Sequence, residues 1–361
     1  MISGNQKISQ RQLGRMVILD WLAKAALLLP GFAAGEDGRS FVLSACLGVF
    51  LALAYAWLVS RVGKRMDREF ADYAEERLGG GCTRFFFLIC FVYVFLNTIF
   101  LLRLFGVVAV TFILPEASAE ILMGVVLLGA VYMVSGGLEV RARVSEVLFA
   151  VIVYPLILLL VCAAFSADSG YLTPGKAALS LKTAEHGMQV FMTFGGMGIF
   201  LFLAPFMSGK EKLGRTLMRS SAVVGLAGIA LFLAAIGAFG EAGMRASSWP
   251  AITLMSSAEI PGGFVQRWDV IFTGLLLASF FAAVGAGLFY MRRLGADLFH
   301  REAPLPGPVM ALLLYGGALW CGSYETALRA YTVAGGYLCV PLLVLFTVLL
   351  AVVERAKRRK L

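Results

Sequence analysis

Apolar residues along this chain gather into ten long stretches, and short polar segments separate each stretch from the next. A stretch of about 20 apolar residues is long enough to cross the hydrocarbon core of a bilayer as a helix. The ninth stretch gives the weakest signal, because it is short and contains Pro306 and Pro308. The pattern predicts an all-α polytopic membrane protein of about ten transmembrane helices, with no separate soluble domain. The expected spans are residues 13–34, 41–62, 85–111, 119–135, 144–165, 188–207, 222–240, 265–291, 305–321 and 328–353.

Lys and Arg collect in every second gap between these stretches. The two termini and the gaps after the second, fourth, sixth and eighth stretches hold 23 of the 31 basic residues, whereas the other gaps hold 6. Because Lys and Arg next to a span stay on the cytoplasmic side, the split predicts cytoplasmic termini and an even number of spans. The same residues account for the net charge of +9. They are membrane-edge anchors, so no nucleic-acid partner is expected.

The composition narrows the class further. The chain is 60% hydrophobic with a mean hydropathy of +0.85, as expected of a protein embedded in the lipid bilayer. No cleavable signal peptide is expected before the first span. The six cysteines show no CxxC spacing, and there are two histidines, so neither a disulfide framework nor a metal site is expected. We expect no cofactor, and no catalytic constellation points to an enzyme.

Three polar segments outside the spans are longer than a turn. Residues 63–84 predict a short amphipathic helix that lies on the inner surface or against the bundle. Residues 166–185 and 241–264 form two outer loops of ~20 residues, for which a lid over a cavity and a simple outer cap are equally open interpretations. The apolar positions of the amphipathic helix are Met66, Phe70, Tyr73, Ala74 and Leu78.

Charged residues also occur inside the spans. Asp20 and Lys24 lie four residues apart in the first span, so they share one helix face. Charges within a membrane are costly and pair with one another or line a cavity. An intrahelical ion pair, a snorkelling Lys24 and a direct role at a ligand cavity are therefore all open. Arg103 lies deep in the third span, and its guanidinium suits a carboxylate, either of Asp20 or of a ligand.

The sixth span contains a cluster of glycines, Gly195, Gly196 and Gly198. Each glycine weakens a helix by roughly 1 kcal/mol, and the cluster favours an unwound segment over close helix packing. Such a segment offers backbone groups to a ligand, as in transporters with broken helices. A corresponding break is expected at residues 20–25 of the first span. The chain is then one membrane domain, residues 1–361, with a five-plus-five inverted repeat (about 9–165 and 186–353), broken first and sixth helices, and a basic cytoplasmic tail at 354–361.

Short motifs spread over nearly the whole chain resemble those of one family. They are Lys7-Ile8-Ser9-Gln10-Arg11-Gln12, Leu27-Leu28-Leu29-Pro30, Ala34-Gly35-Glu36-Asp37, Leu102-Arg103 with Leu114-Pro115-Glu116, Gly136-Gly137-Leu138-Glu139 with Ala142-Arg143 and Glu146, Trp249-Pro250, and Arg267-Trp268-Asp269. In this order and spacing they resemble the spore germination receptor B-subunit family, the endospore germination permeases of the amino acid–polyamine–organocation superfamily. The chain departs from that family at Gly196 and Gln266, where the family has Glu.

The resemblance implies a LeuT-like bundle in the spore inner membrane, with a receptor A-subunit and a lipoprotein C-subunit as partners. It also implies a small nutrient, such as an amino acid, bound between the first, third, sixth and eighth spans. The ligand would bias an alternating-access equilibrium that the partners sense. An amino acid permease, and a scaffold or ion-conducting subunit without its own ligand, are the alternatives. The expected ligand-binding residues are Asp20, Ala23, Lys24, Ala25, Arg103, Thr193, Phe194, Gly195, Gly196, Gly198, Thr273 and Ser279.

Overall fold

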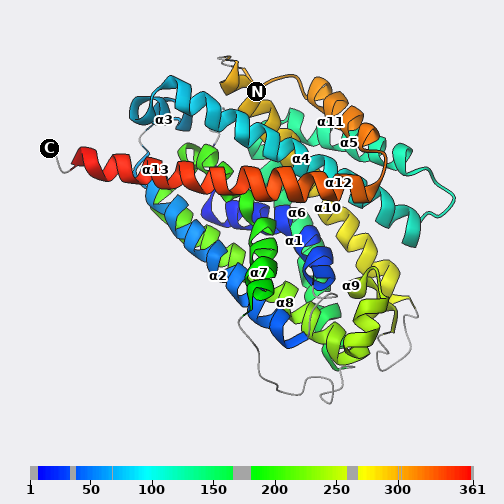
Figure 1. Cartoon of the computed structure of the whole chain (residues 1–361). Coiled ribbons are helices and arrows are strands. Elements are labelled where there is room, and N and C mark those ends of the chain that lie inside the picture. Colours follow the sequence, from blue (N-terminus) through cyan, green and yellow to red (C-terminus); the bar gives the residue numbers. More distant parts are fainter. Residues whose placement is uncertain are drawn as a thin grey trace.

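The structure of the chain, a computed structural model, is a bundle of helices (Figure 1). It describes residues 7–32, 38–66, 68–165, 180–257, 267–299, 301 and 303–358. Each of the ten predicted spans falls on a helix or on a run of consecutive helices. The elements are α1 (Gln10–Phe32), α2 (Gly38–Gly63), α3 (Phe70–Leu78), α4 (Gly80–Phe112), α5 (Ala119–Ser135), α6 (Gly137–Phe165), α7 (Leu181–Thr193), η3 (Gly195–Phe206), η4 (Lys210–Lys212), α8 (Leu213–Ala246), α9 (Pro250–Ser257), α10 (Trp268–Leu298), α11 (Gly307–Cys321), α12 (Tyr324–Ala330), η5 (Tyr331–Cys339) and α13 (Val340–Arg358).

Within the described residues, seven helical segments are long and apolar enough to cross a membrane. They correspond to α2, α4, α6, α7 with η3, α8, α10, and the run from α12 to α13. Two shorter apolar helices, α5 and α11, cover the fourth and ninth predicted spans. The 23-residue α1 covers the first predicted span; at 1.5 Å per residue it is about 34 Å long, which also matches the hydrocarbon thickness. The all-α polytopic membrane architecture is therefore confirmed.

The sixth predicted span changes its helix type at the glycine cluster. The α-helix α7 ends at Thr193, Phe194 has φ −100° and ψ 3°, and the 3₁₀-helix η3 begins at Gly195. The predicted break in this helix is confirmed, although the backbone passes from an α-helix to a 3₁₀-helix instead of unwinding. The tenth span contains a comparable irregularity, because the π-helix η5 separates α12 from α13.

The predicted break in the first span is wrong. α1 is one uninterrupted α-helix from Gln10 to Phe32. Residues 20–25 contain neither Gly nor Pro, and Leu, Ala and Lys are among the strongest helix formers, so nothing in the local sequence ends the helix there. The backbone carbonyls of this stretch consequently stay bonded within the helix and are not offered to a ligand.

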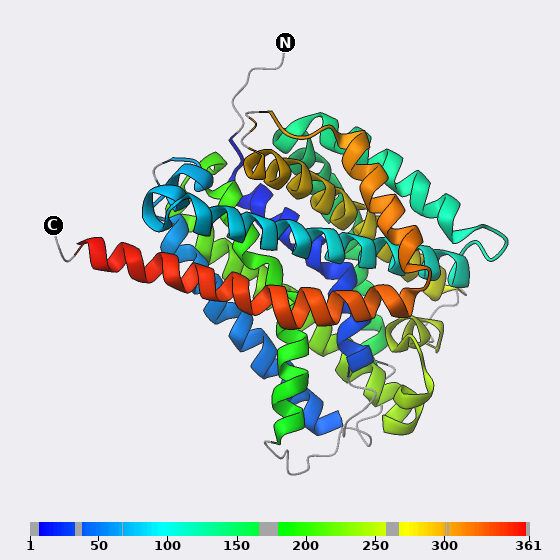
Figure 2. The same cartoon turned by 45° about the horizontal axis from the view of Figure 1, so that its top comes forward.

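Helices from the two halves of the chain pack against each other reciprocally. α1 packs against α8 and α2 against α7, while α4 packs against α10 and α5 against α11. Figure 1 shows α5 and α11 together at one edge of the bundle, and Figure 2 shows the C-terminal helix α13 lying across α2 and α4. Two repeats of inverted topology would produce such an exchange of neighbours, and the repeat boundaries themselves stay a prediction.

The short helix predicted between the second and third spans is confirmed as α3. Phe70, Tyr73 and Ala74 are buried on one face of this helix, which packs against α4, α13 and η3. Glu354, near the end of α13, forms an ion pair with Arg65 at 3.2 Å. Burial raises the pKa of Tyr73 to about 12, and the nearby Glu354 carboxylate adds to this effect. The helix α3 therefore packs the segment between α2 and α4, together with the C-terminal end of α13, onto the bundle.

The two outer loops are described in part. Residues 166–179 and 258–266 lie outside the described residues, as does the Ala34-Gly35-Glu36-Asp37 motif. Within the second loop, α8 extends to Ala246 through a kink at Gly240, whose φ is 64°, and α9 follows. α9 packs against α1, α6, α8 and α10. The second loop therefore carries a short helix of its own, and the choice between lid and cap stays a prediction.

Gly287 of α10 allows a close approach to α4. A Cβ atom at this position would lie 1.9 Å from Oγ1 and 2.9 Å from Cβ of Thr98. We expect Gly287→Ala to lower the free energy of unfolding by about 1–3 kcal/mol, because the two helices must move apart. At Gly274 on the same helix, no atom lies within 4 Å of the position that a Cβ atom would take. Gly274→Ala is therefore the matched control and should be neutral or stabilise by up to about 1 kcal/mol in thermal unfolding of the purified protein. Equal losses for both variants would contradict this packing.

Candidate functional site

A polar pocket lies inside the bundle, where α1, α4, η3 and α10 meet. Its volume is about 50 Å³, which is room for a few water molecules. These four elements correspond to the first, third, sixth and eighth predicted spans, between which the ligand is expected. The residues that line the pocket, here called the central pocket, are Asp20, Trp21, Lys24, Tyr93, Val94, Asn97, Gly196, Ile199, Phe200, Ala283, Ala286, Gly287 and Tyr290.

Lys24 is the buried cation of the central pocket, with 2% of its surface exposed. Its ammonium donates to Oδ1 of Asn97 at 2.9 Å and to the hydroxyl of Tyr331 at 3.0 Å. The Tyr331 hydroxyl in turn donates to the backbone carbonyl of Met192 at 3.1 Å, in the last turn of α7. Phe100 stacks on the Tyr331 ring at 4.9 Å. The lysine is thus held by neutral partners from α4 and η5.

Asp20 does not pair with Lys24, so the predicted intrahelical ion pair is wrong. Both carboxylate oxygens of Asp20 accept from the guanidinium of Arg141 on α6, at 3.0 and 2.7 Å. Arg141 is almost fully buried, and its guanidinium lies 5.4 Å from the Phe289 ring centroid and 5.0 Å from that of Tyr290. A guanidinium that meets both carboxylate oxygens satisfies Asp20 better than an ammonium one turn along the same helix.

Arg103 lies away from the central pocket. Its Nε donates to the carbonyl of Ala318 at 2.6 Å and its terminal nitrogen to that of Leu319 at 3.3 Å, both near the end of α11. Glu120 lies 3.6 Å from the same guanidinium. A cation is stabilised at the carboxyl end of a helix, where carbonyl groups lack intrahelical partners. Of the two alternatives for Arg103, the contact with Asp20 is therefore wrong, because groups at the end of α11 and Glu120 occupy the guanidinium.

The other predicted site residues divide into two groups. Gly196 lines the central pocket, and a Cβ atom there would lie 2.7 Å from Cε1 of Tyr93. Thr193, Phe194, Gly195 and Gly198 form the junction between α7 and η3 and are buried, but they do not line the pocket. The remaining four positions are equally outside its lining: Ala23 and Ala25 are buried in α1, Thr273 is buried in α10, and Ser279 of α10 donates to the carbonyl of Leu19 at 3.2 Å.

Five polar residues of the site were not predicted from the sequence: Asn97, Arg141 and the tyrosines Tyr93, Tyr290 and Tyr331. Asn97 carried a usable signal, because it is an amide inside an apolar span. The tyrosines gave no such sequence signal, because tyrosines are common in membrane helices. Arg141 was misleading, because its place in a basic gap indicated a membrane-edge anchor, whereas it is buried against Asp20.

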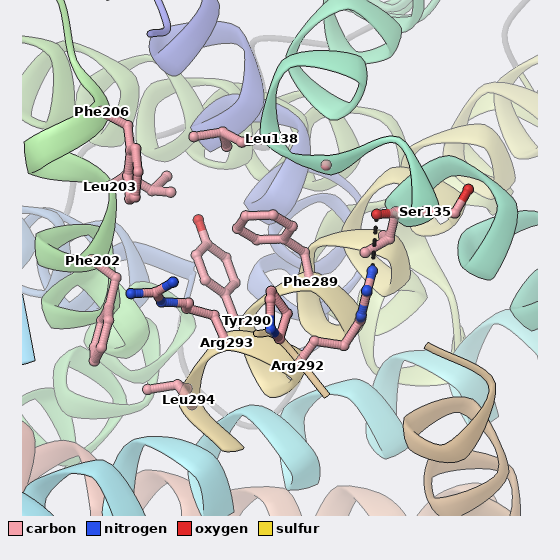
Figure 3. Close-up of a pocket in the computed structure, with 13 residues that line it drawn as sticks. Ser135, Leu138, Phe202, Leu203, Phe206, Phe289, Tyr290, Arg292, Arg293 and Leu294 are labelled. Carbon is pink, nitrogen blue, oxygen red and sulfur yellow. Dashed lines mark hydrogen bonds between the residues drawn. The ribbon is translucent and has the colours of Figure 1, made fainter. Parts of the chain in front are cut away.

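A second, larger cavity lies next to the central pocket. It has a volume of about 210 Å³ and is lined by residues of the α5–α6 junction, η3 and α10. Figure 3 shows Phe289 and Tyr290 of α10 facing Phe202, Leu203 and Phe206 of η3. Arg292 donates to the carbonyl of Val134 at 2.9 Å and closes one end. Tyr290 lines both the central pocket and this second cavity, which we call the inner cavity.

Sequence comparison gives a consistent set of relatives. The profile of the family described as "Spore germination protein" matches residues 7–315. The chain is 24% identical over 366 residues to spore germination protein KB of Bacillus subtilis (strain 168), covering 98% of this chain and 96% of that protein. It is 24% identical over 316 residues to protein YndE of the same organism, covering 84% of each. It is 23% identical over 279 residues to GerLB of Bacillus cereus, covering 74% and 73%.

Structural comparison finds transporters. The fold is similar to Mhp1, a nucleobase-cation-symport-1 family transporter, in a closed conformation with bromovinylhydantoin bound. The TM-score is 0.68 at 12% identity, with 94% of this chain and 77% of Mhp1 covered. A mutant form of a manganese transporter from Eremococcus coleocola gives a TM-score of 0.61 at 11% identity, covering 94% and 76%. At this identity the likeness shows the fold alone, and it confirms the LeuT-like class of fold.

Proposed function

The chain belongs to the spore germination protein family, as a B subunit with a transporter-like fold, and we propose that it is the nutrient-sensing subunit of a germination receptor. In this proposal it lies in the spore inner membrane with both termini in the cytoplasm, because Lys and Arg of the termini and alternate gaps anchor that side. A receptor A-subunit and a lipoprotein C-subunit are its partners. A small molecule such as an amino acid binds in the central pocket and is the signal.

The observation that carries the proposal is the central pocket with its buried Lys24. A membrane protein keeps an ionisable residue inside its bundle at a cost in stability, so such a residue indicates a functional site. Lys24 lies within 3.0 Å of Asn97 and Tyr331, and Gly196 brings the start of η3 to the same pocket. The Lys24 ammonium would bind a ligand carboxylate. The backbone at the α7–η3 junction would lie beside the bound ligand.

The sensing step is a shift between conformations. A ligand shifts such an equilibrium only by the difference between its affinities for the two states. Tyr290 lines both the central pocket and the inner cavity, so its side chain is positioned to respond to an occupied pocket. Lys24 also contacts Tyr331, the first residue of η5, which leads into α13. A ligand that draws Lys24 away from Tyr331 would therefore act on the C-terminal helix.

Thermal unfolding of the detergent-purified subunit against the common amino acids, nucleosides and sugars tests the proposal. A ligand at about 100 times its dissociation constant should stabilise the fold by roughly 2.7 kcal/mol. We expect a selective rise in the melting temperature with one compound or one small group. A flat response to all compounds, both alone and with the A- and C-subunits present, would contradict a binding role and favour a scaffold.

Transport is the second candidate, and the fold favours it. The solved structures with this fold are named as transporters, and they match over 94% of the chain. The described spans have few groups for a proton relay, with Asp20 held by Arg141 and Lys24 held by neutral partners. Concentrative uptake of the stabilising compound into proteoliposomes that contain this subunit alone would establish transport, and binding without uptake would establish sensing.

A further inference from the structure

We propose that the central pocket selects a small ligand with a net charge of −1, such as a short hydroxycarboxylate, over the zwitterionic amino acid of the same skeleton. This inference rests on the proposed function, since it names the ligand class of the same pocket. Four features of the pocket carry it: its charge balance, the acceptors already used, the unbroken α1 and its volume.

The first feature is the charge balance. With Lys24, Arg141 and Asp20 in their ordinary ionised forms, the group holds two positive charges and one negative charge. Asp20 is the one carboxylate among the residues that line the central pocket, and both its oxygens accept from Arg141. The hydrogen-bond partners of Lys24 are the amide of Asn97 and the phenol of Tyr331, which are neutral. A positive charge therefore stays uncompensated inside the bundle, where an anion is strongly stabilised.

The second feature is the hydrogen bonding of Lys24. An ammonium has three N–H donors. Two of them are used, by Oδ1 of Asn97 and by the hydroxyl of Tyr331, whose own proton goes to the carbonyl of Met192. One donor is left for a ligand oxygen.

The third feature is the lack of a free carboxylate for a ligand ammonium among the described residues of the pocket, where the remaining acceptors are neutral, including the hydroxyl of Tyr290. Asp20 is taken by Arg141, and Oδ1 of Asn97 already accepts from Lys24. A broken first helix would have offered backbone carbonyls to an ammonium, but α1 is continuous through residues 20–25 and uses them internally. The positive end of a zwitterion would thus approach Lys24 with neutral acceptors in reach but without a free carboxylate, which lowers its affinity relative to an anion.

The fourth feature is the volume. The central pocket of about 50 Å³ holds a few water molecules, so it accommodates two- or three-carbon ligands after a small expansion. Trp21, Tyr93 and Phe200 surround it with large rings, which restrict longer side chains. The ligand class is therefore a short monocarboxylate with at most one further polar group.

Two matched series of probes test the inference by thermal unfolding of the purified subunit at pH 7. Glycolate, glycine and glycinamide share one skeleton, as do L-lactate, L-alanine and L-alaninamide, and each series runs from an anion through a zwitterion to a cation. Gluconate replaces chloride in the buffer, so that the buffer anion does not compete. We expect the anion of at least one series to raise the melting temperature and to bind at least about ten-fold tighter than its amino acid, a difference of about 1.4 kcal/mol.

Substitutions at two positions identify the pocket as the place of binding. Lys24→Met keeps the side-chain length without the charge and should weaken anion binding by about 10- to 100-fold. Lys64→Met, at an exposed lysine, is the matched control and should leave binding unchanged. Asn97→Asp is nearly isosteric and places a negative charge beside Lys24. It should therefore weaken binding of the anion and strengthen binding of the amino acid of the same series. This second variant keeps the test decisive where Lys24→Met fails to fold.

Two results would overturn the inference. An amino acid that binds as tightly as its matched anion would refute the anion preference and leave the proposed function intact. Anion binding that survives in both Lys24→Met and Asn97→Asp would place the anion elsewhere. Failure of the proposed function has a different signature, since the whole compound panel, amino acids included, would then give no response with or without the partner subunits.

Discussion

Replacing Arg141 with Met is expected to lower the free energy of unfolding by about 3–5 kcal/mol, because it leaves the Asp20 carboxylate unpaired inside the bundle. Arg141 is almost fully buried, and its guanidinium is the partner of both Asp20 oxygens. No other cation lies within ion-pair distance of Asp20 among the described residues. Thermal or chemical unfolding in detergent measures the loss.

The neighbouring Arg143 provides the control for this prediction. It lies on the same helix and also pairs with a carboxylate, that of Glu139, but 68% of its side chain is exposed. Arg143→Met should therefore cost no more than about 1 kcal/mol. The double variant Asp20→Leu/Arg141→Met, which removes both charges, should recover most of the stability lost in Arg141→Met. The buried ion pair would be refuted if the two arginine variants lost the same unfolding free energy. It would also be refuted if the loss in the double variant equalled the sum of the losses in the two single variants.

Replacing Gly196 with Trp is expected to abolish ligand stabilisation. A Cβ atom at Gly196 already lies 2.7 Å from Cε1 of Tyr93, so an indole there must occupy the central pocket. The compound that stabilises the native protein by roughly 2.7 kcal/mol at about 100 times its dissociation constant should then give no shift. Thermal unfolding of the variant with and without the compound measures this, and spore germination in its presence gives a cellular readout.

Gly316 supplies the matched substitution. It is an exposed glycine of α11, and no atom lies within 4 Å of its Cβ position. Gly316→Trp should keep the full ligand response, which separates the blocked pocket from a general effect of a large side chain. A normal ligand response in Gly196→Trp would show that the ligand binds elsewhere.

The charged residues show where sequence reasoning ended. The sequence placed Asp20 and Lys24 on one helix face, and both do line the central pocket. An ion pair between them was one of the interpretations left open, whereas Asp20 is paired with Arg141 and Lys24 with Asn97 and Tyr331. These partners lie 121, 73 and 307 positions away along the chain. Which side chains meet across helices depends on the packing angles and on the rotation of each helix, and local patterns do not contain either quantity.

Three of the twelve predicted site residues, Asp20, Lys24 and Gly196, line the central pocket. The other nine were chosen for their polarity or for their place in an expected break. Thr273 and Ser279 are polar residues of α10 that do not line the pocket, while its lining there comes from Ala283, Ala286, Gly287 and Tyr290. The eighth span was correctly predicted to form one wall of the pocket. Which of its residues face the pocket was not predicted.

The sequence by itself determined the all-α polytopic membrane fold, the short α3 and the end of an α-helix at the glycine cluster. These features depend on hydrophobicity and backbone entropy, which act over one or a few helical turns and are therefore encoded locally. The tertiary structure alone decided that Arg141 is buried against Asp20 and that Lys24 meets neutral partners. Those outcomes arise because the bundle brings distant helices together, and inside a membrane each buried charge takes the partner that packing puts within reach.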